Sequence, residues 1–378
     1  MRIAFDVRPF LKEETGVGIY FRNLLFSLSR IDRENHYYLF SSSWKDRFPG
    51  CKIPPLNNLV FNDLRFPVRL INFLWHKTGW PPLEYFFRAD LDLTHSPTPL
   101  ILPTRGKKIV TVYDLFFMDN PDLSDAEARR HFLPKIEESL QRADAVITIS
   151  QFTKDQLLRR FPLDAAKAHV VHLGIDHSTW MDVPAGDLDA VRMRHGLPSD
   201  FLLFVGAFEP RKNLLRLLEA MKSVQQRYGR IALVLAGRPG QDHPLLMQKI
   251  QELGLAPEVR LLGYLGEREL RCLYRLASVF VFPSLCEGFG LPLLEAMASR
   301  LPVAASRASA LPEILEDAAL YFDPLEPEGM AGQIVRILQD EDVRADLVDK
   351  GVKRVRKFSW DKTARQTLSL YEKTAGQG

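Results

Sequence analysis

The sequence has little cysteine, no long apolar run and no excess of one charge. Its cysteines, Cys51, Cys272 and Cys286, are odd in number and lack the paired spacing of a zinc site, so we expect free thiols and no disulfide or structural metal. No stretch of about 18 uncharged apolar residues occurs, and Asp6 and Arg8 interrupt the place where a signal peptide needs its apolar run. We therefore expect a cytoplasmic protein, free or peripheral at the inner face of the membrane.

The charge balance is nearly even. Lys and Arg number 50 against 47 Asp and Glu, a net charge of +3, which does not favour nucleic acid as a partner. Apolar residues make up 46% and charged residues 26% of the chain, so we expect it to be folded throughout. A length of 378 residues exceeds one ordinary core and predicts two domains.

Short apolar runs recur between helix-length segments in both halves of the chain. They lie at 3–5, 37–40, 109–112, 145–149, 202–205, 231–236, 259–262, 279–282 and 302–305. Strands that alternate with helices form parallel sheets, whose doubly buried strands are continuously apolar. The sequence thus predicts the α/β class, with two Rossmann-like, doubly wound domains that face each other across a cleft.

A polar stretch with proline and glycine suggests where the domains divide. We expect an N-terminal domain over 1–180, a linker at 181–198 and a C-terminal domain over 199–357. Residues 358–378 should form a helix capped by Ser359 that crosses back toward the N-terminal domain.

The densest group of site-like residues follows the expected strand at 279–282. Gly288 and Gly290 let a ligand approach the backbone, and the helix that starts near Pro292 offers unpaired amides to an anion. Glu287 and Glu295 flank this loop and can accept hydrogen bonds from sugar hydroxyls. The alternative is an ordinary helix-start turn with a solvated Glu295, because such turns are common in α/β proteins.

Two adjacent cations follow the expected strand at 202–205. After Gly206, Arg211 and Lys212 open the next helix, where cations oppose the helix dipole. An Arg fork and a Lys point charge suit a diphosphate, so we favour a phosphate site over a solvated helix start.

A third turn contains Gly16 and Gly18 and also suggests a loop that faces an anion. It fails as a dinucleotide fingerprint, since no third glycine follows at the required spacing and the loop after the first strand is too long. A dehydrogenase is therefore disfavoured.

Taken together, these motifs resemble the retaining glycosyltransferases of family 4, which have the two-domain GT-B fold. The most specific likeness is the Glu-x7-Glu pattern of Glu287 and Glu295. Supporting motifs lie at 15–18, 149–153, 209–213, 263–265 and 358–360. The resemblance covers nearly the whole chain.

The resemblance implies that the C-terminal domain binds a nucleotide-diphosphate sugar. It places Glu295 on the ribose hydroxyls and Glu287 near the 3-hydroxyl of the sugar, with Arg211 and Lys212 at the diphosphate. The other implied donor contacts are the turn at Gly206, the backbone amides of Phe289, Gly290 and Leu291 at the sugar and phosphate, the backbone of Tyr264 and Leu265 at the base, and Gly16 and Gly18 from the N-terminal domain.

One position departs from the family pattern. Many members carry His-Asp where this chain has Tyr113 and Asp114, so a tyrosine replaces the histidine that contacts the donor sugar. A phenol can donate one hydrogen bond but is no cation near neutral pH. We keep Asp114 as a catalytic-site residue alongside Glu287, Lys212 and Arg211.

The resemblance further implies retention by front-face attack, in which the leaving diphosphate takes the acceptor proton. The donor would be of the GDP-mannose or UDP-glucose type and the acceptor a glycan or lipid-linked sugar, in cell-surface polysaccharide or lipopolysaccharide assembly. We expect no cofactor and no essential metal; the Asp-x-Asp triplets at 90–92 and 187–189 lie in a strand-like run and in the expected linker. A sugar-nucleotide epimerase on the same fold and a catalytically inactive carbohydrate-binding relative stay open as alternatives.

The stretch 45–108 combines cations with aromatic residues. It holds 10 Lys or Arg against 5 Asp or Glu, and basic and aromatic side chains together suit the headgroup region of a bilayer. Residues 61–88 are therefore a candidate for peripheral membrane contact. The equally favoured alternative is that the aromatic side chains belong to the core and that the cations lie at its solvated edge.

Overall fold

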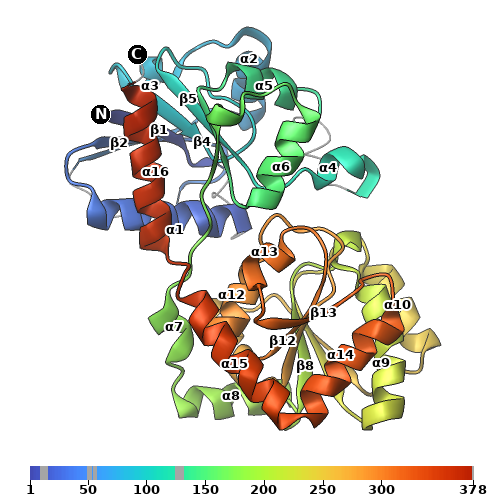
Figure 1. The fold of residues 1–378 in the computed structure, drawn as a ribbon. Helices are drawn as coiled ribbons and strands as arrows, with labels where there is room; N and C mark the ends of the chain where they lie inside the picture. Colours follow the sequence, from blue (N-terminus) through green and yellow to red (C-terminus); the bar gives the residue numbers. More distant parts are fainter. Residues whose placement is uncertain (9–15, 49–52, 54–57, 124–131, 377–378) are drawn as a thin grey trace. The chain divides into compact units, whose positions relative to one another are not determined.

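The computed structural model describes residues 1–8, 16–48, 53, 58–123 and 132–376, and it divides into two compact units (Figure 1). Unit 1 comprises Met1–Gly174 and Ser359–Gly378, and unit 2 comprises Ile175–Phe358. Each unit contains one sheet in which every neighbouring pair of strands is parallel. The expected α/β architecture is confirmed.

The residues expected to form a linker, 181–198, belong to unit 2 instead. They contain helix α8 (Ala185–His195), which packs against α11 (Glu267–Leu276). Pro184 occupies the N-cap of α8, and Gly196 ends it with a left-handed φ of 56°. The proline and glycine that suggested a linker therefore begin and end a helix, as they commonly do.

The sheet of unit 1 has the order β3-β2-β1-β4-β5-β6-β7. Its strands are β1 (Arg2–Asp6), β2 (His36–Ser42), β3 (Leu59–Leu64), β4 (Leu93–Ser96), β5 (Lys107–Val112), β6 (Ala145–Thr148) and β7 (Ala168–Val170). Its helices are α1 (Gly16–Ile31), α2 (Val68–Thr78), α3 (Leu83–Phe87), α4 (Phe116–Asp119), α5 (Ile136–Arg142), α6 (Gln151–Arg160) and α16 (Trp360–Ala375), with short 3-10 turns at Pro121–Leu123 and Ala165–Lys167.

Strand β4 was not anticipated, because its buried side chains are mostly polar. His95, at its centre, is fully buried, and both ring nitrogens are paired: Nδ1 lies 2.6 Å from the Tyr371 hydroxyl and Nε2 lies 2.7 Å from Thr111 Oγ1. Burial lowers the pKa of His95 to about 3, so the ring is neutral. Tyr371 thereby attaches α16 to the sheet.

Helix α16 begins as expected. The Ser359 hydroxyl accepts a hydrogen bond from the Lys362 amide as the N-cap, and the helix lies against α1 (Figure 1, red). Its buried face includes Trp360, Ala364 and Tyr371. The last helix of the chain thus completes the core of unit 1.

The aromatic stretch of unit 1 is divided between core and surface. The Trp75 side chain packs with Phe86 and other apolar residues beneath α2. By contrast, Phe73, Trp80 and Tyr85 are 56%, 58% and 66% exposed.

The sheet of unit 2 has the order β10-β9-β8-β11-β12-β13. Its strands are β8 (Phe201–Val205), β9 (Ala232–Ala236), β10 (Val259–Gly263), β11 (Val279–Phe282), β12 (Val303–Ser306) and β13 (Ala319–Phe322). Its further helices are α7 (His177–Met181), α9 (Leu214–Tyr228), α10 (His243–Glu252), α12 (Leu291–Ala298), α13 (Leu311–Leu315), α14 (Pro327–Gln339) and α15 (Glu341–Val355), with a 3-10 turn η6 (Pro210–Lys212).

The strand order of unit 2 reverses between β8 and β11. From β8 the chain proceeds outward through β9 and β10, then returns to place β11 on the other side of β8. The connections after β8 and β11 therefore continue toward opposite edges of the sheet, so the carboxyl ends of these two strands mark its topological switch point. Open α/β sheets bind their ligands in this place.

Candidate active site

A compact ion cluster lies beyond the carboxyl ends of β8 and β11. Lys212 Nζ lies 2.5 Å from Glu287 Oε1, and Arg211 donates from a terminal guanidinium nitrogen to Glu287 Oε2 at 2.8 Å. Arg211 Nε also donates to Glu209 Oε2 at 2.9 Å. The structure thus brings three of the predicted catalytic residues into direct contact.

Burial and charge act against each other at Glu287. The Lys212 and Glu287 side chains are each 8% exposed, and burial alone would raise the pKa of the carboxyl. Arg211 and Lys212 outweigh burial and lower the pKa of Glu287 to about 2. Burial and the neighbouring Arg211 lower the pKa of Lys212, and Glu287 opposes that shift. Glu287 is therefore ionised at neutral pH and available as a hydrogen-bond acceptor.

Asn213 fixes the turn that presents the two cations. It adopts a left-handed φ of 60°, which Asn tolerates better than most residues. The side-chain nitrogen of Asn213, Nδ2, donates to the carbonyls of Pro283 at 3.1 Å and Pro324 at 2.7 Å. The backbone amide of Leu285 donates to the Arg211 carbonyl at 2.7 Å. These bonds hold η6 and the loop after β11 together.

The N-terminus of α12 follows the loop after β11. Gly290 precedes the helix with a φ of 95°, a conformation that side chains rarely adopt, and Pro292 lies in the first turn. Amides in the first turn of a helix lack intrahelical acceptors and suit an anion. Leu291 begins the helix, while the Phe289 side chain is buried against Phe358. At Phe289 only the backbone is a candidate ligand.

Glu295 lies farther along α12 in a different environment. Its Oε2 accepts a hydrogen bond from the Tyr274 hydroxyl at 2.8 Å, and the Tyr274 ring packs edge-on against Trp180. Burial raises the pKa of Glu295 to about 7, although the bond from Tyr274 opposes this shift. Glu295 therefore titrates near neutral pH.

The remaining predicted residues of unit 2 lie at the same edge of the sheet. Gly206 directly follows β8, where its φ of 154° favours glycine. Tyr264 and Leu265 follow β10, and the exposed Tyr264 ring has the Arg238 guanidinium 4.6 Å from its centroid. This loop thus presents an aromatic ring with a cation against it, next to Gly237, whose amide donates to the Gly263 carbonyl at 2.8 Å.

Three predicted residues belong to unit 1. Gly16 and Gly18 lie in the first turn of α1, and a Cβ at Gly16 would meet no atom within 4 Å. Thr15, which precedes them in the motif, lies outside the described residues. Asp114 follows β5 and accepts a hydrogen bond from the Phe116 amide at 3.1 Å.

Tyr113, which replaces the expected histidine, has a buried hydroxyl that lacks a hydrogen-bond partner among the described residues. Its ring packs edge-on against Tyr20, with centroids 5.8 Å apart. Burial raises the pKa of Tyr113 well above its usual value. In unit 1 this side chain is half-buried, with its hydroxyl turned away from solvent.

The two Asp-x-Asp triplets have structural partners. Asp92 accepts from the Arg2 amide at 2.7 Å, and Asp187 pairs with Arg268 at 2.6 Å. Asp187 stands in α8 rather than in a linker. Across the described ranges, no group of three or more His, Cys, Asp or Glu is placed to hold a metal.

Two residues that contact the glutamates of the site were not predicted from the sequence. Tyr274 contacts Glu295, but as a tyrosine on the amphipathic helix α11 it carries no signal beyond that of a core residue. Ser309, whose hydroxyl accepts from the Glu287 amide at 2.9 Å, lies in a separate loop that no motif marked. Both are brought to the site only by tertiary packing.

Comparison with known proteins identifies the family of the chain. Residues 15–179 match the model of "Glycosyltransferase Family 4", and residues 192–354 match that of "Glycosyl transferases group 1". The chain belongs to glycosyltransferase family 4. It is thus a hexosyltransferase of that family, as the motifs indicated.

Relatives agree with the family assignment over the full length. The chain is 29% identical to O-antigen chain mannosyltransferase B of Escherichia coli, over 98% of this chain and 100% of the relative. Its fold resembles sucrose-phosphate synthase from Thermosynechococcus elongatus (TM-score 0.78, 23% identity, 100% of both chains). It also resembles Anabaena Alr3699/HepE in complex with UDP and glucose (TM-score 0.75, 18% identity, 99% of this chain and 100% of that one). The glycosyltransferase therefore has the GT-B fold.

Proposed function

We propose that this glycosyltransferase moves a hexose, mannose or glucose, from a nucleotide-diphosphate sugar to a glycan or lipid-linked acceptor with retention at the anomeric carbon. The observation that carries the proposal is the buried cluster of Arg211, Lys212 and Glu287 at the reversal point of the unit 2 sheet. Two cations and one ionised carboxylate suit a diphosphate next to a sugar hydroxyl. In this proposal unit 2 binds the donor and unit 1 the acceptor.

The transfer step requires charge stabilisation rather than an enzymic nucleophile. The bond between the anomeric carbon and the phosphate oxygen breaks, and the acceptor oxygen bonds to the same face of that carbon. The acceptor proton passes to the leaving nucleoside diphosphate. Arg211 and Lys212 neutralise the negative charge that develops on the diphosphate, while Glu287 accepts a hydrogen bond from the sugar and holds it in place.

The functions of two similar proteins support the substrate class. The Escherichia coli relative is an O-antigen chain mannosyltransferase, which favours a mannosyl donor and cell-surface polysaccharide or lipopolysaccharide as the product. The Anabaena protein was observed with UDP and glucose, which keeps a UDP-glucose donor in the proposal.

The test is a transfer assay with GDP-mannose and UDP-glucose, each with and without a panel of short glycan and lipid-linked acceptors. We expect one donor to yield free nucleoside diphosphate and a product whose anomeric configuration, read by NMR, matches the donor. Glu287→Gln should abolish transfer, whereas Glu209→Gln, a carboxylate on the exposed side of Arg211, should retain most of it. Conversion of the free donor without acceptor would instead establish an epimerase, and inactivity with every pair would refute the proposal.

We also propose that the enzyme contacts an anionic membrane surface through α2. The exposed face of this helix carries Leu70 and Phe73, 45% and 56% exposed, together with Arg69 and Lys77. The Lys77 ammonium lies 5.3 Å from the Phe73 ring centroid. Apolar and basic side chains on one helix face suit the headgroup boundary, where a lipid-linked acceptor would be found. Among the described residues, no helix is both long and apolar enough to cross a bilayer.

Flotation with vesicles that contain anionic lipid tests this contact. We expect binding that falls on Leu70→Ser or Phe73→Ser and that weakens at high salt. Trp44→Ser is the matched control, because Trp44 is 70% exposed but lies outside α2. Equal flotation of all variants would disprove the contact through α2.

A further inference from the structure

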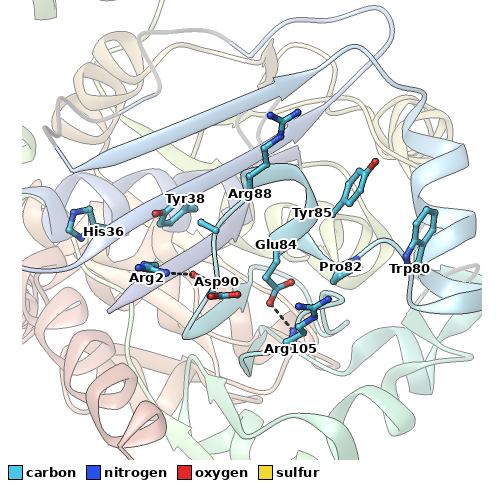
Figure 2. A pocket seen from close by; sticks show the side chains of 11 residues that line it. Arg2, His36, Tyr38, Trp80, Pro82, Glu84, Tyr85, Arg88, Asp90 and Arg105 are labelled. Atoms are coloured by element: carbon cyan, nitrogen blue, oxygen red, sulfur yellow. Dashed lines mark hydrogen bonds between the residues drawn. The ribbon is translucent and has the colours of Figure 1, made fainter.

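A pocket of about 720 Å³ opens at the amino ends of the unit 1 strands (Figure 2). Arg2 at the start of β1 and His36 at the start of β2 line it, and α3 supplies Glu84 and Tyr85. Asp114 follows β5 at the opposite, carboxyl edge of the same sheet. A strand of five residues spans about 16 Å. The pocket is therefore separate from the edge at which parallel sheets of this kind carry out chemistry.

The pocket contains an unsatisfied carboxylate. Glu84 is only 7% exposed, and its Oε1 accepts bonds from Thr104 Oγ1 at 2.7 Å and from the Arg105 amide at 2.8 Å. Its Oε2 is buried and has no hydrogen-bond partner among the described residues. A buried carboxylate oxygen without a donor is costly. A ligand hydroxyl that reaches this oxygen would supply that donor, whereas an ionised phosphate has no hydrogen to donate.

Cations and a second carboxylate surround Glu84. Figure 2 shows the side chains of Arg2, Arg88, Arg105 and Asp90 around the same space. Arg88 has a left-handed φ of 50°, an unfavourable conformation for a residue with a side chain. The three guanidinium groups and two carboxylates nearly balance in charge. The pocket is thus rich in hydrogen-bonding groups without being strongly anion-attracting.

Two exposed aromatic rings complete the lining. Trp80 and Tyr85 are 58% and 66% exposed, and their centroids lie 6.2 Å apart at an interplanar angle of 47°. Both rings are drawn in Figure 2 beside Pro82. Aromatic faces bury the apolar C–H surface of a ligand, and neighbouring carboxylates and guanidinium groups bind its hydroxyls. A neutral carbohydrate is the class of ligand that offers both.

We propose that this pocket is a non-catalytic carbohydrate-binding site that holds part of a glycan chain away from the reacting end. The choice of ligand rests on the proposed function, since a transferase that extends a glycan works on the substance that this pocket fits. A second site on the same chain raises the effective concentration of the glycan at the enzyme. Retention here would therefore favour repeated addition to one chain over release after each transfer.

The experiment measures binding without transfer. Isothermal titration calorimetry of the full chain uses linear oligosaccharides of mannose, of glucose and of N-acetylglucosamine. We expect at least one to bind, and Trp80→Ala and Tyr85→Ala each to weaken its Kd about tenfold, which equals about 1.4 kcal/mol. Phe73→Ala is the matched control, because Phe73 is an exposed aromatic residue of unit 1 that does not line the pocket. It should leave the Kd unchanged.

Three results would overturn the proposal. They are binding of no oligosaccharide, equal binding by the Trp80, Tyr85 and Phe73 variants, and loss of vesicle flotation in the Trp80 variant with saccharide binding intact. The last would make the rings part of a membrane surface.

A parallel assay of transfer to a short acceptor separates the two proposals. Intact transfer without pocket binding refutes the carbohydrate site alone. Pocket binding without transfer from any donor refutes the proposed function alone.

Discussion

Replacement of Glu287 by Gln should cost stability as well as activity. The substitution keeps the shape of the side chain but removes the charge that compensates Arg211 and Lys212. The pKa of Glu287 is lowered from 4.5 to about 2, and the side chain is 8% exposed, so solvent screens it little. A shift of this size corresponds to about 3 kcal/mol of folding free energy at neutral pH.

The contribution of Glu287 to the free energy of unfolding should depend on pH. A carboxyl with a depressed pKa in the folded state stabilises the protein fully above its unfolded pKa, and that contribution disappears as the pH falls through the folded pKa. The wild-type enzyme should therefore exceed Glu287→Gln in free energy of unfolding by about 3 kcal/mol at pH 7. The difference should narrow between about pH 5 and pH 2.

Urea unfolding followed by circular dichroism at several pH values measures this difference. The control is Glu209→Gln, because Glu209 also pairs with Arg211 but is 40% exposed. An exposed pair contributes about 0–1 kcal/mol, so this variant should differ little from the wild type. Equal losses in the two variants, or a Glu287→Gln deficit that does not change with pH, would refute the account of a buried, charge-compensated carboxylate.

Three further outcomes follow from the site and the core. If Glu295 binds the ribose as a carboxylate, the KM for the donor should fall as the pH rises through about 7, the pKa to which burial raises this group, and Glu295→Gln should flatten that profile. Lys212→Ala should lower kcat about 100-fold with a smaller change in KM, measured by steady-state kinetics; a change confined to KM would contradict its role at the leaving diphosphate. Tyr371→Phe should leave the buried His95 Nδ1 unpaired and cost about 1–3 kcal/mol in urea unfolding, whereas Tyr85→Phe, at an exposed position, should cost under about 0.5 kcal/mol.

The sequence indicated the apolar strands well and the polar ones poorly. Strands β8 and β11 are buried on both faces, and their sequences are therefore continuous apolar runs that indicate a strand without further information. Strand β4 has Thr94, His95 and Ser96 buried instead, and His95 is held by Thr111 and Tyr371, 16 and 276 residues farther along the chain. Such a strand depends on tertiary hydrogen bonds, which no local pattern displays.

Glycine and proline signals were ambiguous for a related reason. Proline and glycine are common in linkers, but here they also begin and end α8. What distinguishes the two cases is whether the segment between them can pack, and α8 does so through Asp187 and its ion pair with Arg268 on α11. Only the folded neighbour reveals that partner.

The two glutamates of the Glu-x7-Glu motif show most clearly what spacing leaves undetermined. In sequence they are equivalent carboxylates on either side of a loop, and both were read as hydrogen-bond acceptors. In unit 2 Arg211 and Lys212 lower the pKa of Glu287 to about 2, whereas burial raises the pKa of Glu295 to about 7. Environments that separate the pKa values of two carboxyl groups in this way suit them to different tasks. In the proposed function, Glu287 would serve as a permanent charge at the reacting sugar, while Glu295 would exchange its proton as the nucleotide enters and leaves.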